Sequence, residues 1–506
     1  MSLASPGARP AVARTGRLAP VGAIAGPGRL PAHVAVGLHL LVWGSLFSGL
    51  PGPSALGELS GEGTLLGWLA IMLSATGSGA VLDVRGLKSG LMFLPFLACI
   101  GLSAALNWHE IAQAHFLGRE GGEKFITSLL VAAFYLCAFT ALCGLAEVFG
   151  VRAIVRCAGN AALVVALVLL TEMAVEIVSW FVPPIRSIWV ELRRYWTINP
   201  RAPTFRLVGF APEPAFCALA AMSLLSLLIA ELALRREAGQ RARSARARIV
   251  VLAGILLLAL ELFLANARTF IIGAAGASLA ALLLSRPFAR LPASAKSAVI
   301  VLLPLPVHAA LIWWVSADPA TRSVSDTTRS VGMLVGAQMW REHPLVGVGF
   351  GQYGFHFRAL VPSWAMSDYE LSRYFRFDQY DLLGALQPTF SLFTRTAAEL
   401  GLLGLAAWLA PPLLAIRSAI RRAPGLLTSV MVCALAAQLW SFMSFDSYRN
   451  ANYWFWLALL LAWPKQRPAS WPSPAHARNA AQREISMRPR ARTAAPRPVG
   501  TQPATR

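Results

Sequence analysis

The sequence predicts an all-α polytopic membrane protein with about twelve transmembrane helices. Hydrophobic residues make up 56% of its 506 residues and charged residues only 14%. The apolar runs also lack the periodicity of water-soluble helices and strands. A run of about 20 apolar residues crosses a ~30 Å hydrocarbon core as a helix. Only a helix or a closed barrel satisfies all backbone polar groups in lipid, and these runs have the length of helices.

Twelve apolar segments have this character. In chain order they are 33–50, 63–82, 89–107, 125–148, 153–182, 212–234, 249–266, 268–285, 297–316, 388–416, 425–444 and 451–464. Residues 1–32 and 465–506 are rich in Pro, Ala, Gly and Arg, and have too little apolar surface to fold. We therefore expect disordered cytoplasmic ends around a membrane domain at 33–464. A cleavable signal peptide is not expected, because the first apolar run begins after residue 32.

The Lys and Arg residues of the connecting segments predict the orientation. Most of the 45 basic residues fall in one alternating set of segments, which we assign to the cytoplasm together with both termini. The net charge of +21 needs no nucleic-acid partner, because basic cytoplasmic loops face anionic lipid. The remaining basic residues concentrate in two outer segments, 183–211 and the large periplasmic loop 317–387 between helices nine and ten.

Three arginines, Arg206, Arg268 and Arg329, fall on the predicted outer side, beside the start of a helix. Positive charge is normally kept on the cytoplasmic side, so cations here indicate a bound anion. An arginine in a tight hairpin near membrane depth, as Arg268 is, costs several kcal/mol unless it is paired or faces water. The alternatives are that Arg206 reaches to lipid phosphate and that Glu261 is a structural partner of Arg268.

The segment around Arg329 predicts an amphipathic helix that is capped by Asp326 and stopped by Pro344. Its apolar side carries Val331, Leu334, Val335 and Met339. The glycine-rich turn that follows contains a literal G-x-G-x-x-G at 349–354. No βαβ pattern surrounds it, so a dinucleotide site is not expected.

Four motifs together resemble the O-antigen ligase and polymerase superfamily of bacterial envelope glycosyltransferases. They are Arg206 with Gly209, Asn266-Ala-Arg268, Arg329 followed by His343-Pro-Leu-Val-Gly-Val-Gly-Phe-Gly351, and Glu399-Leu-Gly-Leu-Leu-Gly404. The resemblance covers roughly residues 200–450. It implies glycan transfer from undecaprenyl pyrophosphate at the periplasmic face of the inner membrane, without a metal or cofactor. It also implies that the arginines hold the pyrophosphate, which suits the rigid, permanently charged donor fork of guanidinium.

Within this family, ligases resemble one another in a His-Asn pair about nine residues before the glutamate of the helix-ten motif. Counting back from Glu399 gives Phe390 and Ser391. Because the ligase base is missing and Glu213-Pro214 follows Arg206, the sequence favours a polymerase of polysaccharide repeat units. The alternatives are a ligase acting on a lipid or protein acceptor, and a flippase or transporter of lipid-linked oligosaccharide. The absence of an internal sequence repeat argues against a transporter.

The catalytic candidates are Arg206, Arg268 and Arg329, with Glu213 as general base or as an electrostatic partner of an arginine. The substrate-binding candidates are Arg322, Arg341, His343, Gly347, Gly349, Tyr353 and Glu399. For His343 the alternative is a cap on the preceding helix, and for Tyr353 an interfacial aromatic residue. The expected partners are lipid-linked oligosaccharide, the bilayer, a chain-length regulator and a flippase. We expect no nucleic acid and no metal.

Overall fold

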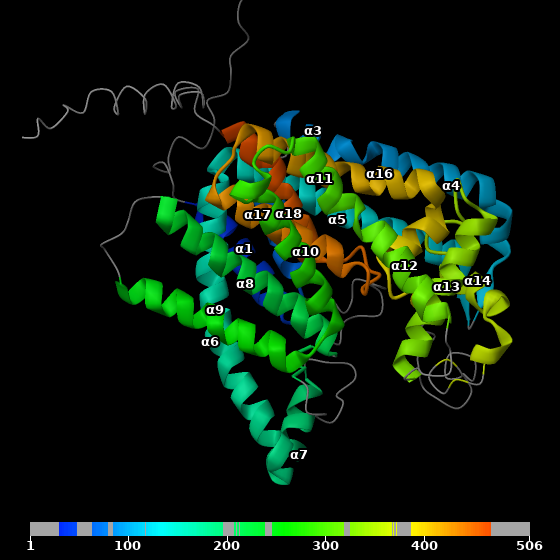
Figure 1. Cartoon of the computed structure of the whole chain (residues 1–506), viewed down its shortest axis with the longest axis horizontal. Helices are drawn as coiled ribbons and strands as arrows, with labels where there is room; N and C mark the ends of the chain where they lie inside the picture. Colours follow the sequence, from blue (N-terminus) through cyan, green and yellow to red (C-terminus); the bar gives the residue numbers. More distant parts are fainter. Residues whose placement is uncertain are drawn as a thin grey trace, which may run out of the picture. The chain divides into compact units, whose positions relative to one another are not determined.

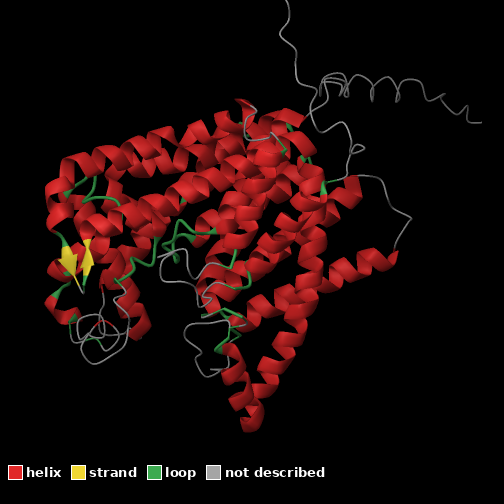
Figure 2. Cartoon of the chain, turned by 180° about the vertical axis from the view of Figure 1, so that it is seen from behind, coloured by secondary structure: helices red, strands yellow, loops and turns green. Residues whose placement is uncertain are grey.

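A computed structural model describes residues 30–47, 63–78, 84–116, 118–195, 207–208, 210–211, 213–237, 245–317, 324–366, 368, 371 and 386–466. These residues are mostly helical, and strand within them is limited to one short antiparallel hairpin (Figure 2). Strand β1 (His115–Phe116) pairs with β2 (Arg119–Glu120), with His115 opposite Glu120. The predicted all-α class is confirmed.

Each predicted apolar segment coincides with an apolar helix or helix pair, as Figure 1 shows. The N-terminal part forms α1 (Ala32–Gly44), α2 (Leu65–Gly77), α3 (Val84–Gly90), α4 (Leu94–Gln113), α5 (Gly121–Phe149), α6 (Val151–Phe181), α7 (Pro183–Arg193) and α8 (Pro214–Glu237). The C-terminal part forms α9 (Ala245–Ala265), α10 (Arg268–Leu284), α11 (Ala293–Leu302), α12 (Pro304–Ala317), α13 (Val324–Glu342), α14 (Tyr353–Leu360), α16 (Leu392–Arg422), α17 (Leu426–Ser441) and α18 (Ala451–Ala462). Short 3₁₀ turns accompany α4, α10, α14 and α18.

Six of the described helices are long and apolar enough to cross a membrane. They are Leu87–Gln113, Gly121–Phe149, Val151–Phe181, Pro214–Glu237, Ala293–Trp313 and Leu392–Arg422. Six shorter apolar helices, α1, α2, α9, α10, α17 and α18, accompany them. The protein is therefore a helical, membrane-embedded protein.

Local sequence accounts for several helix boundaries. The predicted segment 297–316 is divided into α11 and α12 because Pro304 lacks the N–H that would continue the helix. The predicted amphipathic helix is α13, and it ends before Pro344 as expected. The prediction of Asp326 as its cap was wrong, since α13 begins at Val324 and so includes Asp326 in its first turn. The outer segment 183–211 contains α7, which the apolar pattern did not predict.

The main core surrounds α18, whose residues from Tyr453 to Leu460 are all buried. Aromatic rings fix this helix against its neighbours, and the Trp408 ring of α16 stacks on Tyr453 at 5.2 Å between centroids. A smaller core joins α13 and α14 to α16 through Val331, Val335 and Met339, all of them buried. Three residues of the predicted apolar side of α13 are thus in a core, and they hold α13 close to α16.

Candidate functional site

Residues 442–450, which connect α17 to α18 and are called here the α17–α18 link, lie beside the first turn of α10. The Ser444 hydroxyl donates to Thr269 Oγ1 at 3.0 Å. Arg268 precedes Thr269 and is the exposed first residue of α10. The turn before it is closed by Asn266 with φ 45°, a left-handed conformation that Asn adopts more readily than most residues. The tight hairpin predicted between helices seven and eight is confirmed.

The same link contacts the entry of α8. Phe445 packs edge-on against Phe216 with ring centroids 5.4 Å apart. Phe216 lies in the first turn of α8, and its N–H donates to the Glu213 carbonyl at 3.1 Å. Glu213 is half-buried at the residue preceding the helix. The predicted base candidate Glu213 therefore lies about one helical turn before Phe216, the residue that contacts the link.

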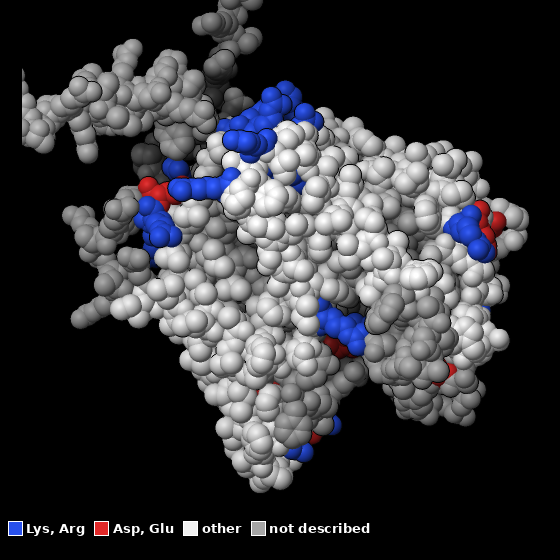
Figure 3. All heavy atoms as spheres, in the orientation of Figure 1, with Lys and Arg blue, Asp and Glu red and all other residues white. Residues whose placement is uncertain are grey.

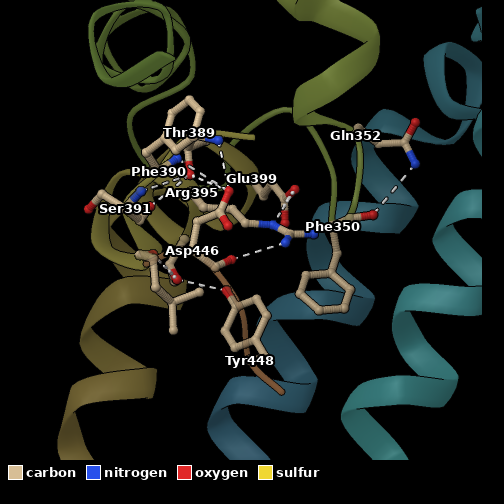
Figure 4. Close-up of polar contacts among 11 residues, drawn as sticks. Phe350, Gln352, Thr389, Phe390, Ser391, Arg395, Glu399, Asp446 and Tyr448 are labelled. Carbon is tan, nitrogen blue, oxygen red and sulfur yellow. Dashed lines mark hydrogen bonds and ion pairs between the residues drawn. The ribbon is translucent and has the colours of Figure 1, made fainter. Parts of the chain in front are cut away.

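Arg329 is connected to the link indirectly, by way of Phe390 in the segment before α16. Its guanidinium carbon lies 5.3 Å from the centre of the Phe390 ring. Phe390 has φ 59°, a strained conformation for an aromatic residue. Asp446 of the link holds it there, since Asp446 Oδ2 accepts from Thr389 N–H at 2.8 Å and from Phe390 N–H at 3.3 Å (Figure 4).

These contacts fall on three consecutive residues, 444–446, which span roughly 7 Å. Thr269, Phe216 and Phe390 thus all contact this one segment. Thr269 follows Arg268, Phe216 lies three residues after Glu213, and the Phe390 ring lies beside the Arg329 guanidinium. Figure 3 shows Lys and Arg side chains gathered on the surface between α10 and the helices α12 and α13. Arg206 lies outside the described residues. Its neighbour Leu207 donates to the Leu264 carbonyl near the end of α9 at 3.3 Å.

Glu261 has a different partner from the one considered in the sequence. It accepts a hydrogen bond from the Cys217 thiol at 3.2 Å and is only 3% exposed. The alternative that Glu261 pairs with Arg268 is therefore wrong.

The glycine-rich turn and the helix-ten motif form a single backbone unit. Gly401 interrupts α16 with φ 65°, which leaves the carbonyls on one side of the kink without helical partners. The turn supplies them, because Val348 N–H donates to the Ala398 carbonyl at 2.9 Å and Gly349 N–H to the Glu399 carbonyl at 3.0 Å. Backbone carbonyls without a hydrogen-bond partner raise the free energy of the folded state in an apolar environment, and these bonds remove that cost.

On the other side of the kink, a backbone N–H group without a helical partner is also bound by the glycine-rich turn. Leu402 N–H donates to the Pro344 carbonyl at 2.8 Å. The Gly347 carbonyl accepts from the Asn107 side chain of α4 at 3.0 Å. Gly347 has φ 68°, and a Cβ there would overlap the α16 backbone at Glu399. Glycine is thus required at position 347 because the backbone of the turn lies too close to the α16 backbone for a side chain.

Four predicted substrate-binding residues therefore belong to the framework. Gly347 and Gly349 are buried against the kink. Glu399 is 1% exposed, and its carboxylate pairs with Arg395 at 3.1 Å. Tyr353 is 3% exposed, and its hydroxyl donates to the Gly332 carbonyl of α13 at 2.7 Å. The assignment of Tyr353 and Glu399 to substrate binding stays a prediction, and in this structure both side chains are enclosed by protein.

Arg395 connects this framework to the link, as Figure 4 shows. Besides pairing with Glu399, its Nη1 donates to the Asp446 carbonyl at 3.1 Å, and its guanidinium lies 5.8 Å from the Tyr448 ring centre. Lys124 of α5 lies within electrostatic range of Arg395, Glu399 and Asp446. Burial raises the pKa of Tyr448, so its hydroxyl stays protonated beside Thr396.

The remaining predicted residues are Arg322, Arg341 and His343. Arg341 is exposed in the last turn of α13, and Arg322 lies outside the described residues. His343 follows the end of α13, the place of a helix cap, and its N–H donates to the Met339 carbonyl at 2.9 Å. Burial lowers the pKa of His356 in α14, and the negative charge of Glu110 partly opposes this shift.

The sequence prediction missed Arg395, Asp446 and Lys124. A usable signal was present at 445–450, where Asp, Tyr, Arg and Asn interrupt two apolar runs. Charged residues in so short a connection must be paired or face an aqueous space. Arg395 was hidden because it lies inside a predicted helix, four residues before Glu399.

Among the described residues, no group of His, Cys, Asp or Glu side chains could hold a metal ion. Comparisons with known proteins returned no match to a family model and none to a curated protein. The fold and the described contacts define a membrane-embedded helical protein with arginines and carboxylates gathered at one end of its apolar helices.

Proposed function

We propose that the protein polymerises lipid-linked polysaccharide repeat units in the bacterial inner membrane. It transfers glycan from an undecaprenyl pyrophosphate carrier to an acceptor hydroxyl on the periplasmic face. The observation that carries this proposal is that residues 444–446 contact the first turn of α10 next to Arg268, the first turn of α8 next to Glu213, and Phe390, whose ring lies beside Arg329. Two permanent cations and a carboxylate beside an apolar helical body suit a substrate with an anionic leaving group on a lipid.

The chemistry follows from the charges. The bond between the sugar and the pyrophosphate breaks while the acceptor oxygen bonds to the same sugar carbon. Negative charge grows on the departing pyrophosphate, and preplaced guanidinium groups lower the barrier by stabilising it. Arg268 and Arg329 have this role in the proposal, with Arg206 as a third contributor. Glu213 accepts the proton of the acceptor hydroxyl, which requires only hydrogen-bond reach.

The proposed topology has twelve membrane spans and both termini in the cytoplasm. The starts of α8, α10, α16 and α18 then face the periplasm together with the α17–α18 link. The basic segments after α8, α10 and α16 face the cytoplasm, as expected from the distribution of Lys and Arg. A chain-length regulator and a flippase are the proposed protein partners.

Phe390 supports polymerase over ligase. It occupies the position where ligases of the resembled family have histidine, and its ring lies beside the Arg329 guanidinium. An aromatic hydrocarbon cannot accept a proton, so a ligase mechanism would need a base from elsewhere. Ligation to a lipid or protein acceptor is the second candidate, and the chemical identity of the product's acceptor end separates the two.

The test uses the full chain, purified and reconstituted in liposomes with undecaprenyl pyrophosphate-linked repeat units on the side facing the arginines. We expect a ladder of lengthened glycans and release of undecaprenyl pyrophosphate. Arg268→Ala should reduce the rate by about a hundredfold or more, and Arg268→Lys by less, because lysine keeps the charge but loses the fork. Arg290→Ala, which changes an exposed arginine between α10 and α11, is the matched control.

Normal chain lengthening by Arg268→Ala at equal protein level would reject the assigned role. Transfer of the substrate across the bilayer without lengthening would instead identify a flippase.

A further inference from the structure

A second polar recess lies against the α17–α18 link. It is a cavity of about 50 Å³ formed by the end of α1, the start of α2, the first turn of α8 and the start of α18. Its polar lining comes from Ser45, Thr64, Arg449, Asn450 and Asn452. A water molecule needs roughly 10–15 Å³ of such volume, so the recess has space for a group of a few atoms and not for a sugar ring.

The recess has a positive electrostatic character. Arg449 lines it, and no acidic residue is among the described residues of its wall. Three helices, α2, α8 and α18, begin beside it, and each N-terminus carries about half a positive charge. Backbone N–H groups and a guanidinium together are the usual means by which proteins hold phosphate.

Thr64 provides an independent indication of a ligand. It lines the recess at the residue preceding α2, is 5% exposed, and its Oγ1 has no hydrogen-bond partner. It makes no side-chain cap on α2, although threonine at this position commonly does. The wall beside it is rigid, because a Cβ on Gly44 would overlap the backbone of Gly63. A buried hydroxyl left free in a rigid, electropositive recess is placed to donate to an anion.

We propose that this recess binds a phosphate group, held by Arg449, the Thr64 hydroxyl and the N-termini of α2 and α8. The N-terminus of α18 is already capped by the Asn450 side chain. The inference does not depend on the proposed polymerase activity, and neither Arg268 nor Arg329 lines the recess. The phosphate has two possible sources, the head group of a membrane phospholipid and a soluble phosphate compound.

The experiment titrates the purified full chain in detergent with inorganic phosphate, measured by calorimetry. We expect saturable binding that weakens by about tenfold in Thr64→Val and in Arg449→Gln. Thr76→Val, the same substitution at the other end of α2, and Arg290→Gln, which changes an exposed arginine between α10 and α11, are the controls, and neither should change the affinity. Thermal unfolding separates binding from folding. Thr64→Val should unfold at the wild-type temperature, because the hydroxyl it removes has no partner in the protein.

A parallel titration uses short-chain phosphatidic acid. Tighter binding than that of inorganic phosphate, with competition between the two, supports a lipid head group as the source. Equal affinity supports a soluble phosphate. The proposal is overturned if the wild-type chain shows no saturable binding, if Thr64→Val and Arg449→Gln bind as the wild type does, or if Arg268→Gln alone abolishes binding.

Discussion

Phe390 illustrates how single residues are fixed at this site. A non-glycine residue in the left-handed region costs of order 1–3 kcal/mol, and such strain persists only where surrounding contacts determine it. Here the determinant is Asp446, whose carboxylate accepts the two consecutive N–H groups of Thr389 and Phe390. The strained backbone places an aromatic ring beside Arg329. Strain of this kind is frequent at functional sites, which agrees with the proposed role of the arginine.

Two substitutions of Phe390 distinguish the effect of its backbone strain from the effect of its ring contact with Arg329. Phe390→Gly and Phe390→Ala both remove the ring, but only glycine adopts positive φ without cost. We expect Phe390→Gly to be about 1 kcal/mol more stable than Phe390→Ala, as measured by thermal unfolding in detergent. Both should slow glycan lengthening, because Arg329 loses a cation–π contact worth about 1 kcal/mol. Equal stability of the two variants would contradict the strain argument.

Asp446 should matter more for stability than any exposed acid. Asp446→Ala leaves the N–H groups of Thr389 and Phe390 without their acceptor, so we expect a loss of about 3 kcal/mol in the free energy of unfolding. Asp446→Asn keeps one acceptor oxygen and should lose less. Glu191→Ala, which breaks an exposed ion pair with Arg194, is the control and should change stability by at most about 0.5 kcal/mol. Denaturant unfolding of the purified variants measures all three.

At the scale of elements, the interruption of α16 and the turn that completes it depend on one another. The kink at Gly401 frees backbone groups on both of its sides, and residues 344–349 bind them. The two most recognisable motifs of the sequence thus meet as complementary halves of one structure. Arg395, next to this structure, connects it to the α17–α18 link. The framework therefore positions the link and, through it, the candidate arginines.

Glycine substitutions test this dependence. Gly347→Ala adds a methyl group that would overlap the α16 backbone, and φ 68° is unfavourable for alanine, so we expect a loss of at least about 2 kcal/mol. Gly101→Ala in α4 meets nothing within 4 Å and should be neutral or stabilising by up to about 1 kcal/mol. Thermal unfolding and yield of folded protein are the measurements. A Gly347→Ala variant as stable as the control would exclude tight packing of the turn on α16.

At the scale of the whole molecule, a single orientation in the membrane has to fit both the order of the apolar helices and the positions of the basic residues. Arg286 and Arg290 follow α10, and Arg421 and Arg422 precede α17, so these four lie at the helix ends opposite the α17–α18 link. The proposed topology requires the link to face the periplasm and these arginines to face the cytoplasm.

Cysteine labelling in cells tests that orientation. Ser363→Cys, at an exposed position of the segment between α12 and α16, should react with a membrane-impermeant maleimide in spheroplasts. Arg290→Cys should react only after the inner membrane is permeabilised. The native cysteines lie in helices, and the unsubstituted chain gives the background. Labelling of both variants from the same side would rule out the proposed topology.

The sequence alone determined the helical membrane class and the positions of the apolar helices. These follow from local properties, because a bilayer requires long apolar helices and the basic residues bias their orientation. The tertiary structure decided which residues meet. Asp446, Arg395 and Lys124 come from three separate parts of the chain, and no local pattern could indicate that Arg395 and Lys124 lie beside Asp446 of the link. It also showed that Gly347, Gly349, Tyr353 and Glu399 are buried, since burial depends on what packs against a residue and not on its own chemistry.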